Sequence, residues 1–395
     1  MFEFVKLNRM MKIAILTRST PHHLVGGMEI ISWNLAKKFV QKDHQVEIIT
    51  TSIPNKPSTF IEEGITIVSL TNTQPGKYSN VWWDKSVEYS LTKNPNIVFS
   101  ISAGAYGLLS HKSDFSMPFV LQIHGTSWGE ILAKIRTNNP LHWIKSLKNF
   151  YTLPLDLSRI PKFDSLVAVG PRVTKDLQSF PFNIVVNPKK VKTITNGVDT
   201  DLFRVCSSQK RFHLRKILGL SQNSKILITA SRIHAQKGIE NILHSFLILL
   251  KERKNLNLVI VGDGPNRENL ERFCCKFRIS ENVIFTGLLS QEDLSKFLNA
   301  SDLFLFLTNH REGLPLNILE ALSTGLNCII SDHLDIFESE MIHKINPKDF
   351  RKVSKKISYL LDQEAVVASS IPENYTLDYS ADQYLQLFES LRSNY

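Results

Sequence analysis

Short apolar runs rich in β-branched residues alternate with helical patterns throughout this chain of 395 residues. Such alternation is typical of an α/β protein, in which helices wrap a largely parallel sheet. The runs form two series of five, separated by a change in composition near residues 189–196. We therefore expect two doubly wound domains, each with its own sheet and core. The expected strands are Lys12–Thr17, Gln45–Thr50, Ile97–Ile101, Phe119–His124 and Ser165–Val169, then Ile226–Ser231, Leu258–Val261, Val283–Thr286, Leu303–Leu307 and Cys328–Ser331.

Two glutamates eight residues apart give the strongest functional indication. Glu312 follows an expected strand, and Glu320 lies inside a helix that Pro315 is suited to begin and Gly325 to end. A buried carboxylate needs a partner, because an unpaired buried charge is costly, and a helix N-terminus attracts phosphate. This arrangement fits a nucleotide diphosphate-sugar, with the sugar on Glu312, the diphosphate at the helix start and the ribose on Glu320. The alternative is a surface helix with two solvated glutamates.

Further candidates follow other expected strands, at the sheet edge where ligands bind in such folds. Gly26 and Gly27 precede an amphipathic helix, where glycines let a phosphate approach the helix N-terminus. His124 ends a strand and can point into a cleft. Arg232 and Lys237 together can neutralise a departing diphosphate without a metal. The alternatives are an ordinary turn, a packed histidine and solvated surface cations.

The sequence predicts no metal site and no cofactor other than a nucleotide-sugar donor. Asp199-Thr200-Asp201 matches the DxD metal triplet of a different transferase architecture, but it stands in an expected linker and the triplet is common by chance. The four cysteines show no metal-binding or disulfide spacing, which favours reduced thiols in the cytoplasm.

The net charge of +10 is unevenly distributed. Residues 1–190 contain 22 Lys and Arg against 13 Asp and Glu, whereas residues 191–395 contain 25 against 24. Within the first half, residues 126–162 alternate cations with apolar and aromatic side chains, a pattern typical of helices that lie on anionic membranes. We expect peripheral attachment to the inner face of the cell membrane through this segment; an ordinary helix with solvated cations is the alternative. Nucleic-acid binding is not expected.

Taken together, these motifs resemble the large retaining glycosyltransferase family 4. The specific piece is the block from Glu312 to Glu320, with Ala300-Ser301-Asp302 upstream. The other pieces are weaker one by one but run across nearly the whole chain. They are Gly26-Gly27-Met28-Glu29, His124-Gly125, Asn196-Gly197-Val198-Asp199 with Phe203, Arg232 with Lys237-Gly238, Gly262-Asp263-Gly264-Pro265 and Phe285-Thr286-Gly287.

The resemblance implies the GT-B fold, in which two doubly wound Rossmann-like domains face a central cleft. It implies an acceptor-side domain over 1–193, a nucleotide-sugar-binding domain over 194–375, and a final segment 376–395 that crosses back onto the first. It also implies a metal-independent hexosyltransferase that retains anomeric configuration. The donor is then a nucleotide-diphosphate sugar, and the acceptor a glycan, a lipid-linked saccharide or a polysaccharide.

Roles for single residues also follow from the resemblance. Arg232 and Lys237 are expected to hold the diphosphate and Glu312 the transferred sugar. Glu320 is expected to hold the ribose, while His124 contacts the sugar from the other domain. The remaining donor-binding residues implied are Gly26, Gly27, Gly313, Leu314, Pro315 and Leu316, together with Gly287 and Leu288, which are expected to line the base pocket.

Two departures from the family pattern concern the donor site. Pro315 replaces a glycine seen in some members and has no N–H to offer a ligand. After Asp332 the usual glycine-rich continuation is missing, and residues 333–348 are expected to be short and irregular.

Two other functions are compatible with the sequence. One is a nucleotide-sugar epimerase or a phosphorylase on the same fold, although no lysine is singled out to carry a phosphorylase cofactor. The other is a basic membrane- or nucleic-acid-binding protein with a decayed site. It accounts for the N-terminal charge but not for Arg232, Lys237, Glu312 and Glu320 together.

Overall fold

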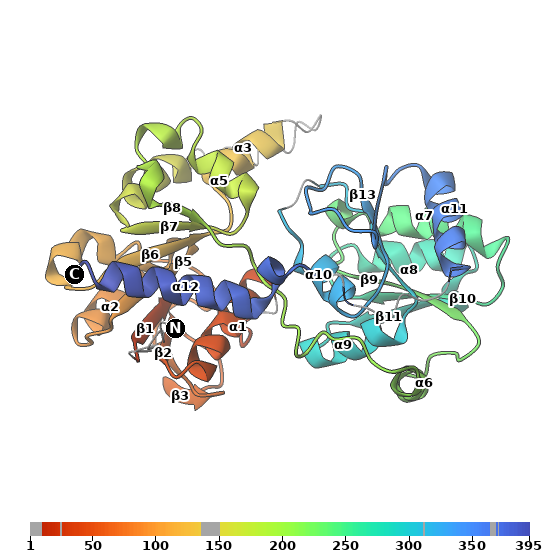
Figure 1. The fold of residues 1–395 in the computed structure, drawn as a ribbon, viewed down its shortest axis with the longest axis horizontal. Helices are drawn as coiled ribbons and strands as arrows, with labels where there is room; N and C mark the ends of the chain where they lie inside the picture. Colours follow the sequence, from red (N-terminus) through yellow and green to blue (C-terminus); the bar gives the residue numbers. More distant parts are fainter. Residues whose placement is uncertain (1–9, 24–25, 136–150, 311–312, 364–368, 370) are drawn as a thin grey trace, which may run out of the picture. The chain divides into compact units, whose positions relative to one another are not determined.

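The computed structural model describes residues 10–23, 26–135, 151–310, 313–363, 369 and 371–395. They divide into two compact units (Figure 1). Unit 1 spans Met1–Gly197 and Leu377–Tyr395, and unit 2 spans Val198–Thr376. The chain thus passes between the units twice, and its last helix belongs to unit 1.

Unit 1 contains an eight-stranded sheet of order β3-β4-β2-β1-β5-β6-β7-β8. Every described pair of neighbours is parallel except the hairpin of β3 and β4. The strands are β1 Lys12–Leu16, β2 Gln45–Thr51, β3 Thr59–Glu62, β4 Ile65–Leu70, β5 Ile97–Ile101, β6 Phe119–Ile123, β7 Ser165–Ala168 and β8 Val191–Thr193. The α-helices are α1 Gly27–Gln41, α2 Asn80–Leu91, α3 Ser127–Ile135, α5 Pro171–Leu177 and α12 Leu377–Arg392. Short 3-10 turns are η1 Ser102–Ala105, η2 Leu108–Asp114, η3 Ile160–Lys162, η4 Phe182–Ile184 and η5 Pro188–Lys190, and residues 151–159 are helical.

The two faces of this sheet carry separate layers because side chains alternate along each strand. Val98 of β5 joins the core that contains Trp82 of α2. Its neighbour Phe99 points the other way, with its ring 5.1 Å from that of Tyr384 and 5.4 Å from that of Phe388 on α12. Both faces are therefore buried, as a parallel sheet requires.

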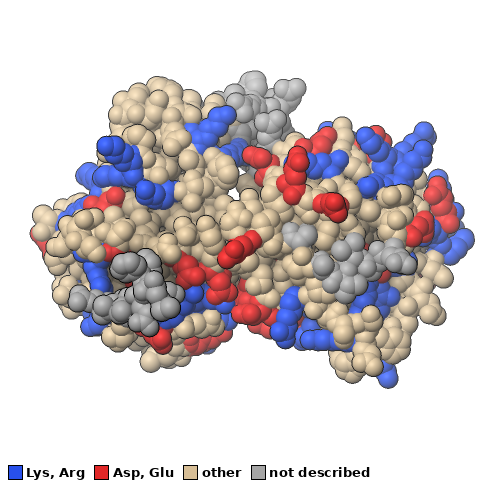
Figure 2. Space-filling model, in the orientation of Figure 1, with Lys and Arg blue, Asp and Glu red and all other residues tan. Residues whose placement is uncertain are grey.

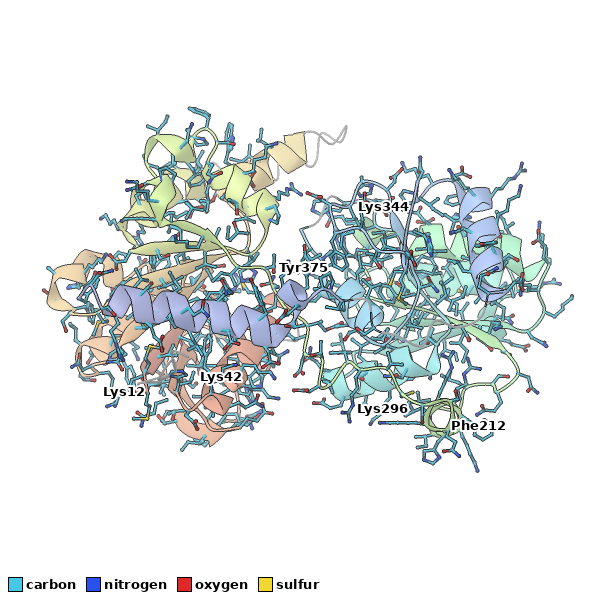
Figure 3. The ribbon with its side chains drawn as sticks, viewed as in Figure 1. Lys12, Lys42, Phe212, Lys296, Lys344 and Tyr375 are labelled. Carbon is cyan, nitrogen blue, oxygen red and sulfur yellow. The ribbon has the colours of Figure 1, made fainter. Side chains whose placement is uncertain are left out.

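Helix α12 packs beside α1 on this second face (Figure 1). Phe39 of α1 contacts Tyr384 and Phe388 through edge-on rings. Around these rings, ion pairs join Lys38 to Asp378 at 2.9 Å and Lys42 to Asp382 at 2.8 Å; Lys42 is labelled in Figure 3. A helix about 340 residues further along the sequence thus completes the core of unit 1.

Unit 2 contains a six-stranded sheet of order β11-β10-β9-β12-β13-β14, parallel at every described pair. The strands are β9 Lys225–Ala230, β10 Leu256–Val261, β11 Val283–Gly287, β12 Leu303–Phe306, β13 Cys328–Ser331 and β14 Ile342–Ile345. The α-helices are α6 Ser208–Ile217, α7 Ile239–Leu250, α8 Arg267–Lys276, α9 Gln291–Ala300, α10 Leu316–Ser323 and α11 Phe350–Leu361. The 3-10 turns are η6 Ala235–Lys237, η7 Ser280–Asn282 and η8 Glu373–Tyr375.

Strand β12 shows how this sheet is covered on both faces. Leu303 and Leu305 pack into a core with residues of α7, α8 and α11. Phe304 and Phe306 pack into another core with residues of α6, α9 and α10. The alternation within four consecutive residues makes unit 2 a doubly wound sheet, so the expected α/β architecture is confirmed for both units.

Nine of the ten expected strands match observed ones to within one residue at either end, and β10 begins two residues early. Four strands were not expected: β3, β4, β8 and β14. The interpretation of 333–348 as wholly irregular is therefore wrong, because Ile342–Ile345 pairs in parallel with β13. Three of the four, β3, β8 and β14, are short strands at the edges of their sheets. Their side chains are partly exposed, so their apolar pattern is weak.

Charges of both signs are mixed over the face of the molecule drawn in Figure 2. Among the described residues, no helix is both long and apolar enough to cross a bilayer.

Candidate functional site

Glu320 lies on α10 and is only 6% exposed. Its neighbours Leu319 and Ala321 are fully buried in the core that also contains Phe304 and Phe306 of β12. Burial raises the pKa of its carboxyl group to about 7, and a side-chain hydrogen bond from Gln291 of α9 acts in the opposite direction. The sequence therefore placed this carboxylate correctly inside a helix, but did not find Gln291. A carboxylate has about four acceptor positions, so Glu320 has capacity to accept from ligand hydroxyls.

The two predicted cations follow β9. Arg232 is exposed, two residues beyond the strand, and Lys237 ends the 3-10 turn η6. The Lys237 ammonium group lies 5.6 Å from the centre of the Phe306 ring, at the end of the neighbouring strand β12. Gly238 then turns the chain with φ of +65°, where a Cβ atom would stand 1.9 Å from the Leu307 carbonyl oxygen. Only glycine fits this crossing.

Hydrogen bonds join this cationic loop to the segment that leads to Glu312. The carbonyl oxygen of Gln236 accepts from the Asn309 backbone N–H at 2.8 Å and from the Thr308 hydroxyl at 2.9 Å. Asn241 donates to the carbonyl oxygen of Leu307 at 3.0 Å. Glu312 itself lies outside the described residues, so its placement remains a prediction.

The start of α10 is held against the end of β9. Pro315 is the N-cap and no side chain caps the helix, and Asn317 in the first turn donates to the carbonyl oxygen of Ala230 at 2.5 Å. Gly313 is exposed, and Leu314 and Leu316 are half-buried. The helix N-terminus and the Arg232 loop are thus brought together, as the phosphate-binding prediction requires, and Asn317 is a positioning residue that the sequence did not indicate.

Gly287 is the last residue of β11, the edge strand next to β10, and Leu288 follows it. Gly287 has φ of +74°, and its carbonyl oxygen accepts from the Gly262 N–H at 2.9 Å. Leu288 is 64% exposed, so its side chain is accessible to a ligand. An exposed apolar residue beside a glycine turn suits stacking against a base, but their role in a base pocket remains a prediction.

In unit 1, Gly26 and Gly27 stand at the start of α1. Gly26 is the N-cap without a side-chain cap, and Gly27 is the first helical residue. A Cβ atom on Gly27 would meet no described atom within 4 Å. Behind the turn, buried Glu29 accepts a hydrogen bond of 2.6 Å from the Ser19 hydroxyl. The predicted phosphate approach to this helix end remains a prediction.

His124 follows β6 and is held by a chain of two hydrogen bonds. Gln122 donates through Nε2 to the Tyr384 hydroxyl of α12 at 2.6 Å, so its Oε1 is the free acceptor. His124 Nε2 lies 2.9 Å from that oxygen and must therefore donate to it. Burial lowers the pKa of His124 to about 4, so the ring is neutral and Nδ1 is left as an acceptor.

A cavity of about 410 Å³ adjoins His124 within unit 1. Besides His124 and Tyr106, its polar side chains include the hydroxyls of Ser102, Thr126, Ser127 and Thr152 and the carboxylates of Glu130 and Asp156. Asp156 accepts from the Tyr106 hydroxyl at 2.9 Å and from the Ser127 hydroxyl. No described lysine or arginine lines this cavity. Its chemistry suits hydroxyl groups of a neutral ligand.

The rejected DxD triplet has a structural explanation. Asp199 Oδ1 accepts from the backbone N–H groups of Asp201 at 3.0 Å and Leu202 at 3.2 Å. The side chain therefore closes a turn at the start of unit 2. The described residues contain no cluster of three or more His, Cys, Asp or Glu side chains arranged to hold a metal ion.

Two family models match the chain. The one described as "Glycosyl transferases group 1" matches residues 210–375, and the one described as "Glycosyltransferase Family 4" matches residues 25–202. Together they cover most of both units. The chain belongs to the family 4 glycosyltransferases, which confirms the resemblance inferred from its motifs.

Individual relatives agree with this assignment. N-acetyl-alpha-D-glucosaminyl L-malate synthase of Bacillus anthracis is 25% identical over 315 residues, which cover 77% of this chain and 75% of the relative. UDP-Gal:alpha-D-GlcNAc-diphosphoundecaprenol alpha-1,3-galactosyltransferase of Escherichia coli is 32% identical over 152 residues, 38% of each chain.

Solved structures show the same fold. Sucrose-phosphate synthase from Thermosynechococcus elongatus matches with a TM-score of 0.75 at 16% identity, covering 98% of this chain and 100% of that one. HepE of Anabaena in complex with UDP-glucose matches with a TM-score of 0.69 at 16% identity, covering 97% and 98%. The GT-B architecture expected from the sequence is thus confirmed.

Proposed function

We propose that this glycosyltransferase moves a sugar from a nucleotide-diphosphate sugar to a hydroxyl group of a glycan, lipid-linked or polysaccharide acceptor, with retention of configuration. The observation that carries the proposal is the junction of two loops in unit 2. Hydrogen bonds through Gln236 hold the loop of Arg232 and Lys237 against the segment that leads to Glu312. The cations proposed for the diphosphate are therefore tied by hydrogen bonds to the chain segment that precedes the carboxylate proposed for the sugar.

In the proposed reaction the two cations stabilise the charge that develops on the leaving group. The bond between the anomeric carbon and the diphosphate breaks, and negative charge grows on the leaving phosphate. Arg232 and Lys237 stabilise that charge without requiring a metal. The leaving phosphate takes the proton of the acceptor hydroxyl as the new glycosidic bond forms on the same face. Glu312 holds the sugar hydroxyls, so no side chain needs to act as a nucleophile.

The donor assignment is supported by Glu320 and by the relatives. A buried carboxyl with spare acceptor positions suits the two hydroxyls of a ribose. The Escherichia coli relative is named for UDP-Gal, and HepE was solved with UDP-glucose. A nucleotide-sugar donor is the shared chemistry, and the present chain is proposed to use one.

The acceptor is proposed to enter beside His124. The neutral ring offers Nδ1 as an acceptor for a hydroxyl proton, and the adjoining cavity is lined with hydroxyls and carboxylates. Peripheral attachment to an anionic membrane through 126–162 would bring a lipid-linked acceptor within reach. Of that segment, 136–150 lie outside the described residues.

Substitution in unit 2 tests the proposed chemistry. A thermal-shift screen of UDP, GDP and ADP sugars first identifies the donor, since a ligand stabilises the fold by mass action. Glu312→Ala should then abolish transfer while binding of the nucleoside diphosphate largely survives. Arg232→Ala should lower kcat/KM by about 100-fold or more, because it removes a donor to the developing charge, and should weaken diphosphate binding as well.

Arg272→Ala is the matched control, because this arginine is exposed on α8 and, among the described residues, its guanidinium group donates only to Asn269 nearby. It should leave both quantities unchanged. An unaltered rate in Arg232→Ala would remove that residue from the mechanism. Isomerisation of the donor without transfer to any acceptor would identify the enzyme as an epimerase instead.

A further inference from the structure

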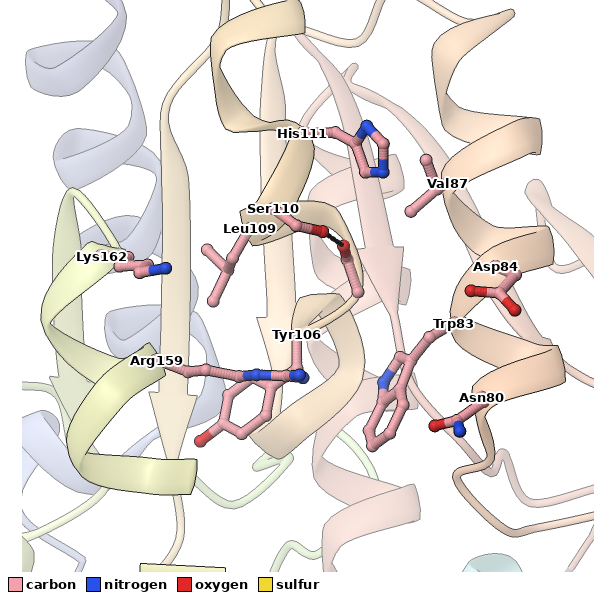
Figure 4. A pocket seen from close by; sticks show the side chains of 11 residues that line it. Asn80, Trp83, Asp84, Val87, Tyr106, Leu109, Ser110, His111, Arg159 and Lys162 are labelled. Atoms are coloured by element: carbon pink, nitrogen blue, oxygen red, sulfur yellow. Dashed lines mark hydrogen bonds between the residues drawn. The ribbon is translucent and has the colours of Figure 1, made fainter. Parts of the chain in front are cut away.

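A second cavity of unit 1, of about 380 Å³, lies between α2, η2 and residues 159–162 (Figure 4). Of the described residues, Tyr106 alone lines both this cavity and the one beside His124. The Tyr106 hydroxyl is engaged by Asp156, so the two cavities meet different parts of this side chain. None of the proposed donor or acceptor contacts uses the second cavity.

Arg159 is the central side chain of this cavity. Its guanidinium carbon lies 5.4 Å from the centre of the Trp83 ring and 5.5 Å from that of Tyr106. Figure 4 shows the guanidinium group next to both rings. Contact with two aromatic rings restricts the orientation of the planar group and leaves its N–H edge to make hydrogen bonds.

Arg159 Nη1 is buried and has no hydrogen-bond partner among the described residues. No described carboxylate forms an ion pair with this guanidinium group either. A buried donor without an acceptor is uncommon in folded proteins and costs free energy, more so on a charged group. The arrangement therefore lacks an acceptor of hydrogen bonds, and a negatively charged one compensates it best.

The remaining charges of the cavity favour an anion. Among the described residues, Lys162 and His111 line it with Arg159, and the one carboxylate is that of Asp84. His111 is itself 3.4 Å from Asp114, outside the lining, so Lys162 and Arg159 are the principal cations. In Figure 4, Lys162 and Asp84 lie on opposite sides of the guanidinium group.

We propose that this cavity binds an oxyanion, a phosphate or a carboxylate group, with Arg159 as its bidentate anchor and Lys162 as a second cation. The anion comes either from solution, as free phosphate, or from a sugar phosphate that is part of the acceptor. Only the second source rests on the proposed function. An acceptor with a neutral saccharide and a separate anionic group would match the different lining of the two cavities.

Calorimetric titration of the full chain tests the site. Arg232→Gln serves as the background, because it removes the cation expected to bind phosphate in unit 2. At constant ionic strength, inorganic phosphate should bind saturably, and adding Arg159→Gln should weaken it at least about tenfold, since a charge-assisted forked contact is lost. Arg159→Lys keeps the charge but not the forked geometry of the guanidinium group. Its affinity for phosphate should lie between those of the parent and of Arg159→Gln.

Lys93→Gln is the matched control, because Lys93 also lies over an aromatic ring, Tyr89, but outside the cavity. It should bind phosphate like its parent. If Arg159→Gln does not fold, Lys162→Gln tests the site instead, because Lys162 is exposed. Its substitution should weaken the binding of inorganic phosphate about threefold. Equal affinity in the Arg159 or Lys162 variants and their parent would overturn the proposal.

Glucose 1-phosphate distinguishes the two sources. Binding at least about tenfold tighter than that of inorganic phosphate supports an acceptor group, and equal binding supports free phosphate. In both cases Arg159→Gln should weaken the binding. If the protein transfers no sugar but still binds phosphate through Arg159, the proposed function fails and the anion site stands.

Discussion

Glu320 shows how one residue's environment can matter more than its identity. In solution its carboxyl group is ionised at neutral pH, whereas burial in unit 2 raises its pKa to about 7. The folded protein therefore binds this proton more tightly than the unfolded chain does. Such a group favours folding below the unfolded pKa, and the advantage is lost as the pH rises through the folded pKa.

We expect Glu320→Gln to change the pH dependence of stability. Near pH 5 the variant and the parent should have similar free energies of unfolding. By pH 8 the variant should be the more stable, by up to about 3 kcal/mol, because it has no charge to bury. Urea unfolding across this range measures the difference. Glu252→Gln, at an exposed turn, controls for loss of a surface charge, and a pH-independent effect of Glu320→Gln would contradict the assignment.

At the scale of elements, the site depends on the loops after β9 and β12. These strands are neighbours, and their loops cross where Gly238 passes the carbonyl oxygen of Leu307. Asp302 secures the other end of the pair: it accepts from Arg215 at 2.7 Å and from the Ile226 N–H at 2.6 Å. The family-like Ser301-Asp302 thus has a structural role at the amino ends of the strands.

Gly238→Ala should destabilise the protein far more than Gly219→Ala. Both glycines have nearly the same positive φ, +65° and +67°, but a Cβ atom on Gly219 meets nothing within 4 Å. Gly219→Ala should cost about 1–2 kcal/mol from the left-handed backbone alone. Gly238→Ala adds a clash with the backbone and should cost about 3 kcal/mol or more. Equal urea-unfolding midpoints of the two variants would show that the loops do not pack closely at Gly238.

At the scale of the molecule, the division into units changes the distribution of charge. Residues 1–190 carry +9, to which Lys192 adds one. The C-terminal helix removes two, with Asp378, Asp382 and Glu389 against Arg392, so that unit 1 carries +8 and unit 2 carries +2. The acids of α12 neutralise lysines of α1, so the basic excess of unit 1 lies elsewhere. This excess includes the segment 126–162.

Membrane attachment can be measured by co-sedimentation with vesicles. The protein should bind vesicles that contain anionic lipid more tightly than neutral ones, and added salt should weaken the binding. Lys145→Glu with Lys148→Glu should reduce binding at least about tenfold, because each basic residue near such a surface contributes about 1 kcal/mol. Lys251→Glu with Lys254→Glu makes the same change in net charge on exposed residues of unit 2. Equal binding to neutral and anionic vesicles would reject the attachment.

The pattern of residues was sufficient to derive the doubly wound architecture, most strand positions and the family. Apolar alternation, helix caps such as Gly325 and motifs after strands all act over a few residues, and so they are visible in one sequence. The predicted positions of Arg232, Lys237 and Glu320 at strand ends and on a helix follow from the same local rules.

Only the folded chain decides which distant groups meet. Gln122 and Tyr384 are 262 residues apart, yet their hydrogen bond determines which nitrogen of His124 carries the proton. Gln291 as the partner of Glu320, and Arg159 between Trp83 and Tyr106, likewise arise from topology. Burial and hydrogen-bond geometry are set by packing across the sheet, which local periodicity does not encode.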